Sequence, residues 1–443
     1  MGRFAMRRLT LIVAVCGMLA ACGDTWLGEN AAPPLPGKRV SILAHSKTLD
    51  ADEGASKEEV ILPAPENVPE WPQAGGYTPH AMYHLHLGDN LKKVWSSDIG
   101  AGGNTRRALV SQPIVADGKV FTMDAKAVVS AFDIKRGRRL WHLDLTPDDA
   151  DGGSYGGGLA FDEGHLYATT GFAQVVAIDP NTGKTLWRQP TPAPVRGAPT
   201  VRGGRVLVIT VENETQALSA EDGHVLWHHN GINELASLLG GTSPAVDGNV
   251  VVVPYSSGEL FALRIENGTT LWSEAITAMK RTDQVTTLTD IHGLPVIDRG
   301  KVYAAGNSDV LAAIDLRTGR RLWDREVGST QTPWIAGDYL YLVTNTPELV
   351  CIEAKTGRVR WVTPLQEWSN EEDKKGRIVW SGPVLASDRL IVASSEGEAW
   401  AVSPYTGEVI GREELPDGVR IAPIIADDTL IFVTDEGELV AYR

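Results

Sequence analysis

The sequence predicts an all-β protein, an eight-bladed β-propeller of four-stranded antiparallel blades, and three observations lead to this prediction. A short unit with a small side chain, a turn glycine and a tryptophan recurs along the chain. A pair of short apolar segments, separated by a Gly or Asp turn, precedes the copies. The copies follow one another at roughly 40 to 50 residues, which is the repeat length of a propeller blade.

The chain begins with a pattern typical of a bacterial lipoprotein signal. Arg3, Arg7 and Arg8 precede the apolar run LTLIVAVCGMLA, which is too short to span a bilayer as a mature helix. Small residues then lead to Cys22 in the sequence LAAC, which matches the lipobox, where the cysteine thiol takes up a diacylglycerol. We therefore expect residues 1–21 to be a cleaved signal peptide and Cys22 to carry lipid. An ordinary signal peptide with an incidental cysteine is the alternative.

Residues 22–70 are rich in Pro, Ala and acidic residues and show no sustained period. Such a composition is typical of a flexible tether, here between the lipidated Cys22 and a propeller of residues 71–443. Gly23 follows the cysteine, and in the enteric sorting rule this residue favours passage to the outer membrane. The expected location is the periplasmic face of the bacterial outer membrane, and the inner membrane stays open outside enteric bacteria.

Charge and cysteine content exclude several classes of function. The formal net charge is −15, and the leader removes three arginines and no acid, so the mature chain carries −18. A surface this acidic argues against nucleic acid or anionic headgroups as partners. Of the three cysteines, Cys16 leaves with the leader and Cys22 is expected to be acylated, so Cys351 remains without a partner for a disulfide or a multi-cysteine zinc site.

The repeat unit has fixed internal spacing in all seven copies. AAIDLRTGRRLW, residues 312–323, is one example. A glycine lies four residues before the last position, and a small side chain lies six residues before that glycine. The small side chain is Ala in six copies and Cys351 in the other, and Gly411 takes the last position in one copy. In the remaining six copies the last position is Trp141, Trp187, Trp227, Trp272, Trp323 or Trp361.

A propeller blade explains each of these residue types. The glycine supplies the positive φ of a tight hairpin between the third and fourth strands. The tryptophan on the fourth strand is expected to lie in the seam between blades, and the small residue on the third strand leaves room for its ring. Replacing such a buried ring typically costs about 3 to 5 kcal/mol. Cys351 is accordingly expected to be a small core residue rather than a reactive thiol.

The two ends of the chain predict how the ring closes. The last segment, IAPIIADDTLIFVTDEGELVAYR, supplies three strands, with Ala441 at the small position. Residues 91–99 supply a lone strand with Trp95 where a fourth strand would have its tryptophan. We expect this N-terminal strand to complete the last blade, because a closed ring of eight leaves no free sheet edge. A ring of seven is the alternative if the unit around Gly411 is not a full blade.

The repeat resembles the tryptophan-docking repeat of quinoprotein alcohol dehydrogenases. That resemblance implies a propeller, and members of that family bind pyrroloquinoline quinone and calcium, with an adjacent-cysteine disulfide and a catalytic aspartate. This chain has no adjacent cysteines and no convincing set of calcium-binding acids outside its repeats. We therefore expect no catalytic residue, cofactor or metal. A periplasmic quinoprotein-like dehydrogenase is the alternative function, followed by another kind of binding propeller.

The lipobox, the proline-rich tether and the eight blades together are similar to the BamB family, the lipoproteins of the outer-membrane β-barrel assembly machine. The resemblance covers essentially all of the mature chain. It implies a non-catalytic scaffold that binds the periplasmic part of BamA and assists insertion of outer-membrane proteins. Two connectors between blades carry the resemblance at the level of motif, NELASLLGGTSPAV at residues 233–246 and LTDIHGLPV at residues 288–296.

These two connectors supply the expected partner surface. Leu235, Leu238 and Leu239 lie together without strand periodicity, as apolar anchors of an interface would. Asp290 and His292 on the next connector are expected to form its charged rim, with Asp290 meeting a basic side chain of BamA. By resemblance Leu238 and Asp290 keep the family identity, whereas Leu239 and His292 replace an Arg and an Asp. In the alternative, the leucines fold back and cap the propeller.

Two other patterns have simpler explanations than chemistry. Residues 152–156 fit G-x-S-x-G, but they lie in a glycine-rich connector rather than between a strand and a helix, which argues against a hydrolase. His80, His84 and His86 have spacings that could ligate a metal. Because no cysteine lies near them, we expect these histidines to have a surface or packing role.

Overall fold

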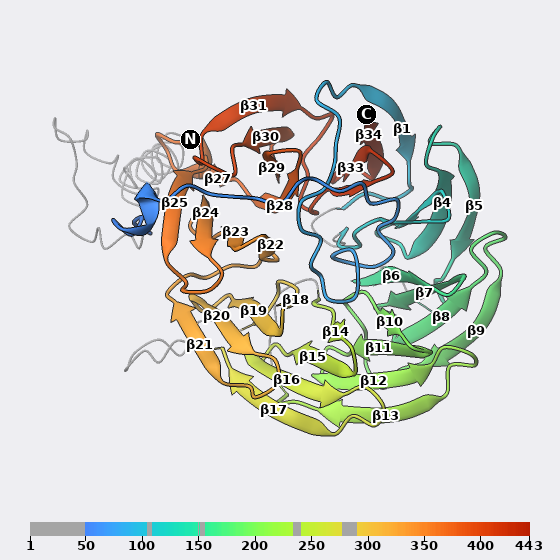
Figure 1. Ribbon diagram of the computed structural model, residues 1–443. Helices are drawn as coiled ribbons and strands as arrows, with labels where there is room; N and C mark the ends of the chain where they lie inside the picture. Colours follow the sequence, from blue (N-terminus) through green and yellow to red (C-terminus); the bar gives the residue numbers. More distant parts are fainter. Residues whose placement is uncertain (1–48, 104–108, 149, 151–155, 234–240, 277–289) are drawn as a thin grey trace, which may run out of the picture. The chain divides into compact units, whose positions relative to one another are not determined.

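Eight four-stranded antiparallel sheets follow one another around a ring (Figure 1). The computed structural model describes residues 49–103, 109–148, 150, 156–233, 241–276 and 290–443. The expected all-β, eight-bladed propeller is confirmed, and the unit around Gly411 is a full blade. Beside the blades, the described residues include a 3-10 helix, η1 (Ala55–Lys57), and a small hairpin of β26 (Trp368–Asn370) and β27 (Lys375–Arg377).

We number the blades along the chain, and each runs from its innermost to its outermost strand. Blade 1 contains β2 (Ile114–Ala116), β3 (Lys119–Met123), β4 (Val128–Asp133) and β5 (Arg139–Asp144). Blade 2 contains β6 (Gly157–Asp162), β7 (His165–Thr170), β8 (Gln174–Ile178) and β9 (Thr185–Pro190). Blade 3 contains β10 (Thr200–Arg202), β11 (Arg205–Ile209), β12 (Glu214–Ser219) and β13 (Val225–Asn230). Blade 4 contains β14 (Ala245–Asp247), β15 (Val250–Pro254), β16 (Glu259–Arg264) and β17 (Thr270–Ala275).

The remaining four blades have the same order of strands. Blade 5 contains β18 (Val296–Asp298), β19 (Lys301–Gly306), β20 (Val310–Asp315) and β21 (Arg321–Arg325). Blade 6 contains β22 (Trp334–Ala336), β23 (Tyr339–Val343), β24 (Glu348–Glu353) and β25 (Val359–Pro364). Blade 7 contains β28 (Trp380–Ala386), β29 (Arg389–Ser394), β30 (Glu398–Val402) and β31 (Val409–Glu414). Blade 8 contains β32 (Ile424–Ala426), β33 (Thr429–Val433), β34 (Glu438–Tyr442) and β1 (Lys93–Asp98).

Blade 8 joins the two ends of the folded chain. Strand β1 pairs antiparallel with β34, and Trp95 lies opposite Ala441. The backbones of Lys92 and Arg443 exchange two further hydrogen bonds, of 2.8 and 3.0 Å. The expected closure by the N-terminal strand is therefore confirmed. Because β1 is the outermost strand of blade 8, this sheet has four strands, as the other seven blades do.

In each blade, the small residue of the third strand belongs to a row of four residues that are paired across the four strands. In blade 5 the row is Val296, Tyr303, Ala313 and Trp323, each paired with the next across the sheet. The rings of Tyr303 and Trp323 flank Ala313 with their centroids 6.2 Å apart, so a larger third side chain would collide with them. Cys351 takes the same place in blade 6, where it is fully buried and burial raises the pKa of its thiol.

Seven of the eight rows end in an indole, which lies in the seam to the next blade. In seven seams its Nε1 donates to a backbone carbonyl of the next blade at 2.7 to 3.1 Å. The donor and acceptor residues are Trp95 and Ile134, Trp141 and Pro180, Trp187 and Ala220, Trp227 and Ile265, Trp272 and Leu316, Trp323 and Ala354, and Trp361 and Pro404. A Cβ on the turn glycine of that next blade would come within 2.6 to 2.7 Å of the ring, so the glycine provides space as well as its positive φ.

Residues 66–87, which we call the floor segment, cross one end of the ring and form hydrogen bonds with all eight blades. The segment is part of the blue trace in Figure 1. In order from blade 1 to blade 8, the bonds join Trp71 to Val115, Pro72 to Phe161, Gln73 to Val201, Thr78 to Val246, Pro79 to Ile297, Tyr83 to Trp334, Leu85 to Leu385 and Val68 to Asp427. Six of these bonds join backbone groups, whereas the side-chain amide of Gln73 and the indole of Trp334 supply the other two, and together they tie the blades to one segment.

The chain just before the floor segment lies against blade 6. Asp52 accepts a hydrogen bond from the amide of Val359 at 2.6 Å, and its own amide donates to the Val359 carbonyl at 2.9 Å. The hydroxyl of Tyr339 donates to the carbonyl of Glu59. The folded unit thus begins at Leu49, and residues 49–70, which the sequence placed in the tether, contact the blades. The expected signal peptide and Cys22 lie outside the described residues. In the part of the chain that is described, no helix has the length and apolar character needed to cross a membrane.

Candidate functional site

The ring surrounds a central cavity of about 390 Å³. Trp71, Gly75 and His80 of the floor segment contribute to its lining. The rest of the wall comes from the connectors that enter the innermost strands, among them Arg196 before β10 and His292 before β18. The floor segment and the connectors therefore line the same central cavity.

Three successive connectors are in direct contact beside this cavity. The hydroxyl of Thr242, which ends the connector from blade 3 to blade 4, donates to the carbonyl of Gly293 on the next connector at 3.4 Å. A Cβ on Gly197, in the connector before blade 3, would come within 2.1 Å of the Thr242 carbonyl oxygen. The structure thus brings the two connectors predicted to bind a partner to one place. Leu235, Leu238 and Leu239 themselves lie outside the described residues.

Asp290 and His292 lie deeper than the sequence predicted. Asp290 is only 6% exposed, and its carbonyl accepts the amide of Asn307, which follows β19. Burial lowers the pKa of His292, and the negative charge of Asp290 opposes that change. Both residues line a small pocket of about 40 Å³ between blades 3, 4 and 5. Asp290 is therefore not an exposed rim charge, because its backbone bond to blade 5 draws the connector inward.

His80, His84 and His86 each have a different neighbour and do not converge. Burial lowers the pKa of His80 to about 4. The Nδ1 atoms of the three imidazoles lie 2.7 Å from the Pro295 carbonyl, 2.6 Å from the Pro63 carbonyl and 2.8 Å from the Asp428 carboxylate, respectively. The Nε2 of His84 accepts the amide of Asp388 at 3.0 Å. The histidines hold the floor segment and its flanks to the blades.

The described wall of the central cavity can be compared with the ligands that calcium would need. Within the described ranges, no group of three or more His, Cys, Asp or Glu side chains could hold a metal ion. Cys351, the cysteine that the structure describes, is buried inside blade 6. Of the G-x-S-x-G motif at residues 152–156, the structure describes Gly156 alone.

Comparison with known proteins identifies the family to which this propeller belongs. The sequence model of the outer membrane protein assembly factor BamB matches residues 91–154, 125–363 and 366–443. This chain belongs to the BamB family. A BamB from Yersinia pestis is 27% identical over 356 residues, which cover 79% of this chain and 88% of that relative. The crystal structure of BamB from Moraxella catarrhalis has a TM-score of 0.68 at 19% identity, covering 80% of this chain and 100% of that chain.

Quinoprotein dehydrogenases share the fold of the BamB family. Quinohemoprotein alcohol dehydrogenase from Comamonas testosteroni has a TM-score of 0.65 at 15% identity, covering 84% of this chain and 80% of that chain. A likeness at this identity shows the propeller fold alone. Pyrroloquinoline quinone and calcium do not fit the residues present, because adjacent cysteines are missing from the sequence and the described cavity wall has no cluster of acids.

The sequence did not indicate the floor segment. Its residues carry no repeat, and its contacts with the blades are mostly backbone hydrogen bonds. The only available signal was the stretch between the proline-rich region and Trp95, which contains His80, His84 and His86 and matches no blade. In this chain, the polar stretch that matches no blade is the segment that contacts residues far away in the sequence.

Proposed function

We propose that this chain is a non-catalytic scaffold lipoprotein of the outer-membrane β-barrel assembly machine, which assists the insertion of outer-membrane proteins. The observation that carries the proposal is the match to BamB from residue 91 to residue 443, a range that includes the connectors as well as the blades. A closed ring suits this role, because rigid blades hold connecting loops in fixed positions for a partner.

The partner in this proposal is the periplasmic part of BamA, and it binds the surface formed by the two connectors. Leu235, Leu238 and Leu239 supply apolar anchors there. The hydrogen bond from Thr242 to Gly293 supports the proposal, because it joins the leucine-rich connector to the next one. Asp290 is buried and His292 is half-buried, and the backbone bond from Asn307 to Asp290 holds the second connector to blade 5, so we assign them the role of positioning it rather than of meeting a charge of the partner.

The anchor in this proposal is a lipid on Cys22 at the periplasmic face of the outer membrane. Several acyl chains on one residue hold a protein firmly, because each buried methylene contributes about 0.8 kcal/mol. The residues between Cys22 and Leu49, where the folded unit begins, would then be the tether. This arrangement keeps the propeller near a membrane-embedded partner and leaves it free to rotate.

Affinity purification from detergent-solubilised membranes tests the proposal. The wild-type chain is expected to retain BamA, and Leu238→Ala with Leu239→Ala is expected to lose most of it. Leu186→Ala is the matched control, since Leu186 is an equally apolar residue, 50% exposed, on the outer strand of blade 2. Retention of BamA by the double variant, or a loss that follows its unfolding, would show that the partner binds elsewhere.

A quinone-dependent dehydrogenase is the second candidate, and the central cavity with the shared fold is what favours it. Titration with pyrroloquinoline quinone and calcium, followed by absorption spectroscopy and metal analysis, separates the two functions. The scaffold proposal predicts no saturable binding of either. Stoichiometric binding of both would replace it with the enzyme.

A further inference from the structure

The seam between blades 7 and 8 differs from the other seven. The row that crosses blade 7 consists of Val384, Ile391, Ala401 and Gly411, so glycine stands where the other rows have tryptophan. At the same place the structure has a cavity of about 320 Å³, lined by Ile391, Ala401 and Gly411. We call this cavity the seam socket. The seam socket lies beside Gly411, the position that tryptophan takes in the other rows.

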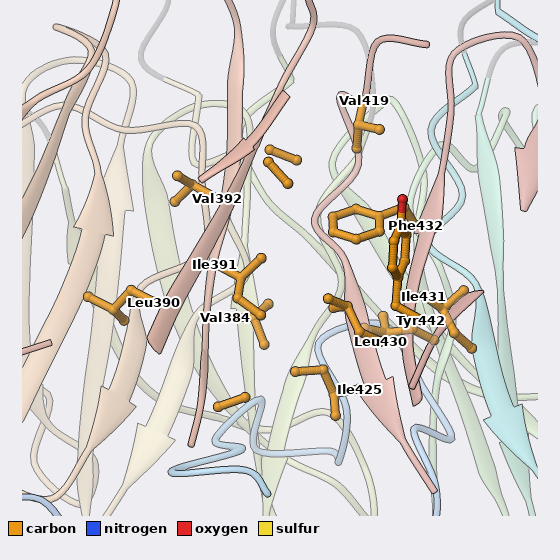
Figure 2. Packing of buried hydrophobic residues seen from close by; sticks show 14 of the residues in the cluster. Val384, Leu390, Ile391, Val392, Val419, Ile425, Leu430, Ile431, Phe432 and Tyr442 are labelled. Carbon is orange, nitrogen blue, oxygen red and sulfur yellow. The ribbon is translucent and has the colours of Figure 1, made fainter. Parts of the chain in front are cut away.

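The opposite wall of the seam socket belongs to blade 8 and is largely apolar. Leu430, Phe432 and Tyr442 line it, and the two aromatic rings meet edge to face with centroids 5.9 Å apart. Figure 2 shows Ile391 on one side and the rings of Phe432 and Tyr442 on the other. In the other seams the indole packs on a turn glycine instead. The wall that faces Gly411 therefore consists of side chains of blade 8 in place of a turn glycine.

The size and chemistry of the socket suit an aromatic ring. An engineered apolar cavity of about 150 Å³ binds benzene, and the seam socket has roughly twice that volume. Trp400 also lines it, with the guanidinium of Arg412 lying 4.0 Å from the centre of its ring. Ile410 lines the socket and is 55% exposed, which adds apolar surface at its edge. Asp89, Arg389, Arg412 and Glu413 also line the socket, and a hollow with apolar walls and a few polar groups is typical of a binding site.

We propose that the seam socket binds a tryptophan side chain presented by a partner polypeptide. The rows of the other seven blades end in an indole that lies in the seam, and the row of blade 7 ends in Gly411 instead. The chain's own Trp26 lies outside the described residues, and a variant at this position is part of the test below. This site is separate from the connector surface, and the proposal does not depend on BamA.

Fluorine NMR of the full-length chain with the peptide acetyl-Gly-(5-fluoro-Trp)-Gly-amide tests this proposal. The fluorine signal reports the peptide alone, although the chain contains 13 tryptophans of its own. The wild-type chain is expected to broaden and shift that signal in a saturable way, and the same peptide with 5-fluoro-Trp replaced by 4-fluoro-Phe is expected to bind less tightly. Absence of saturable binding of the tryptophan peptide overturns the proposal.

Gly411→Trp is the decisive variant, because it fills the socket from within. A Cβ at Gly411 has, among the described residues, one neighbour within 4 Å, the Cβ of Ala401 at 3.7 Å, so the new side chain has room. The variant is expected to weaken peptide binding at least tenfold and to raise the melting temperature. Leu186→Trp, which adds an exposed indole to blade 2, is the matched control and should bind as the wild type does.

Three outcomes would overturn the assignment. Equal binding by the wild type and Gly411→Trp would place the peptide elsewhere. Tighter binding by Trp26→Ala would show that the chain's own segment occupies the socket and that no partner is needed. If Gly411→Trp does not fold, Gly411→Leu fills part of the same space, and undiminished binding by that folded variant would equally reject the seam socket.

Discussion

Gly319 and Gly300, both in blade 5, show what a single residue of the repeat contributes. Both have a φ of +72°, so both have the backbone conformation that glycine favours. A Cβ on Gly319 would lie 2.6 Å from the indole of Trp272, whereas a Cβ on Gly300 would have no described atom within 4 Å. The repeat glycine therefore has two functions, the turn and the contact with the ring, and the other turn glycine has one.

Alanine at these two glycines separates the two contributions. Gly300→Ala is expected to lower the free energy of unfolding by about 1 kcal/mol, since backbone strain is its only cost. Gly319→Ala is expected to cost a further 1 to 3 kcal/mol or so, because the indole must shift. Urea unfolding followed by circular dichroism measures both. Equal losses in the two variants would contradict the packing of Trp272 against Gly319.

His80 makes stability depend on pH in a defined window. Burial lowers the pKa of its imidazole from 6.5 to about 4. Between these values the unfolded chain binds a proton that the folded chain does not, so the free energy of unfolding falls as the pH drops from 6.5 towards 4. The fall due to His80 alone is at most about 3 kcal/mol.

His80→Asn tests this dependence. Asparagine tolerates the positive φ of 60° at this position and does not titrate in the window. Unfolding free energies measured between pH 4 and pH 6.5 should slope less steeply in the variant, although His292 and His229, whose pKa values burial also lowers, keep some slope. Parallel slopes in the two proteins would mean that His80 is protonated while folded.

At the scale of elements, the sequence predicts structure that depends on local spacing and misses structure that depends on long-range contacts. The repeat places turns and strands by local spacing, which is why all eight blades and the closing strand β1 could be predicted. The floor segment could not, because most of its bonds join backbone groups, which carry no sequence signal. The burial of Asp290 was missed for the same reason, since it depends on the backbone bond to Asn307.

Truncations rank the N-terminal elements by their contacts. A chain that begins at Leu49 is expected to melt as the mature chain does, because it keeps every described contact. A chain that begins at residue 61 loses the bonds between Asp52 and Val359 and should melt a few degrees lower. A chain that begins at residue 101 loses the floor segment and β1, and it should fold poorly or not at all. Similar melting temperatures for all three chains would contradict closure by these elements.

At the scale of the whole molecule, the proposed anchor residue Cys22 precedes the folded unit in the sequence. The compact unit of Leu49–Arg443 contains all eight blades, so lipid on Cys22 is not needed for it to fold. Cys22→Ser is expected to release the protein from the membrane fraction or to block its processing, with the melting temperature unchanged. Metabolic labelling with a fatty acid checks the anchor, and continued labelling of the variant would place the lipid on another residue.

The central claim is that this propeller assists the assembly of outer-membrane β-barrels without catalysing a reaction. Its most direct test is the amount of folded barrel protein in the outer membrane of cells that lack the chain, measured beside cells that express it again. The account predicts a lower amount of folded barrels without the chain and recovery with the wild type, but less recovery with Leu238→Ala and Leu239→Ala combined. Unchanged barrel levels, together with the loss of a quinone-dependent oxidation in the same cells, would contradict the scaffold and favour the enzyme.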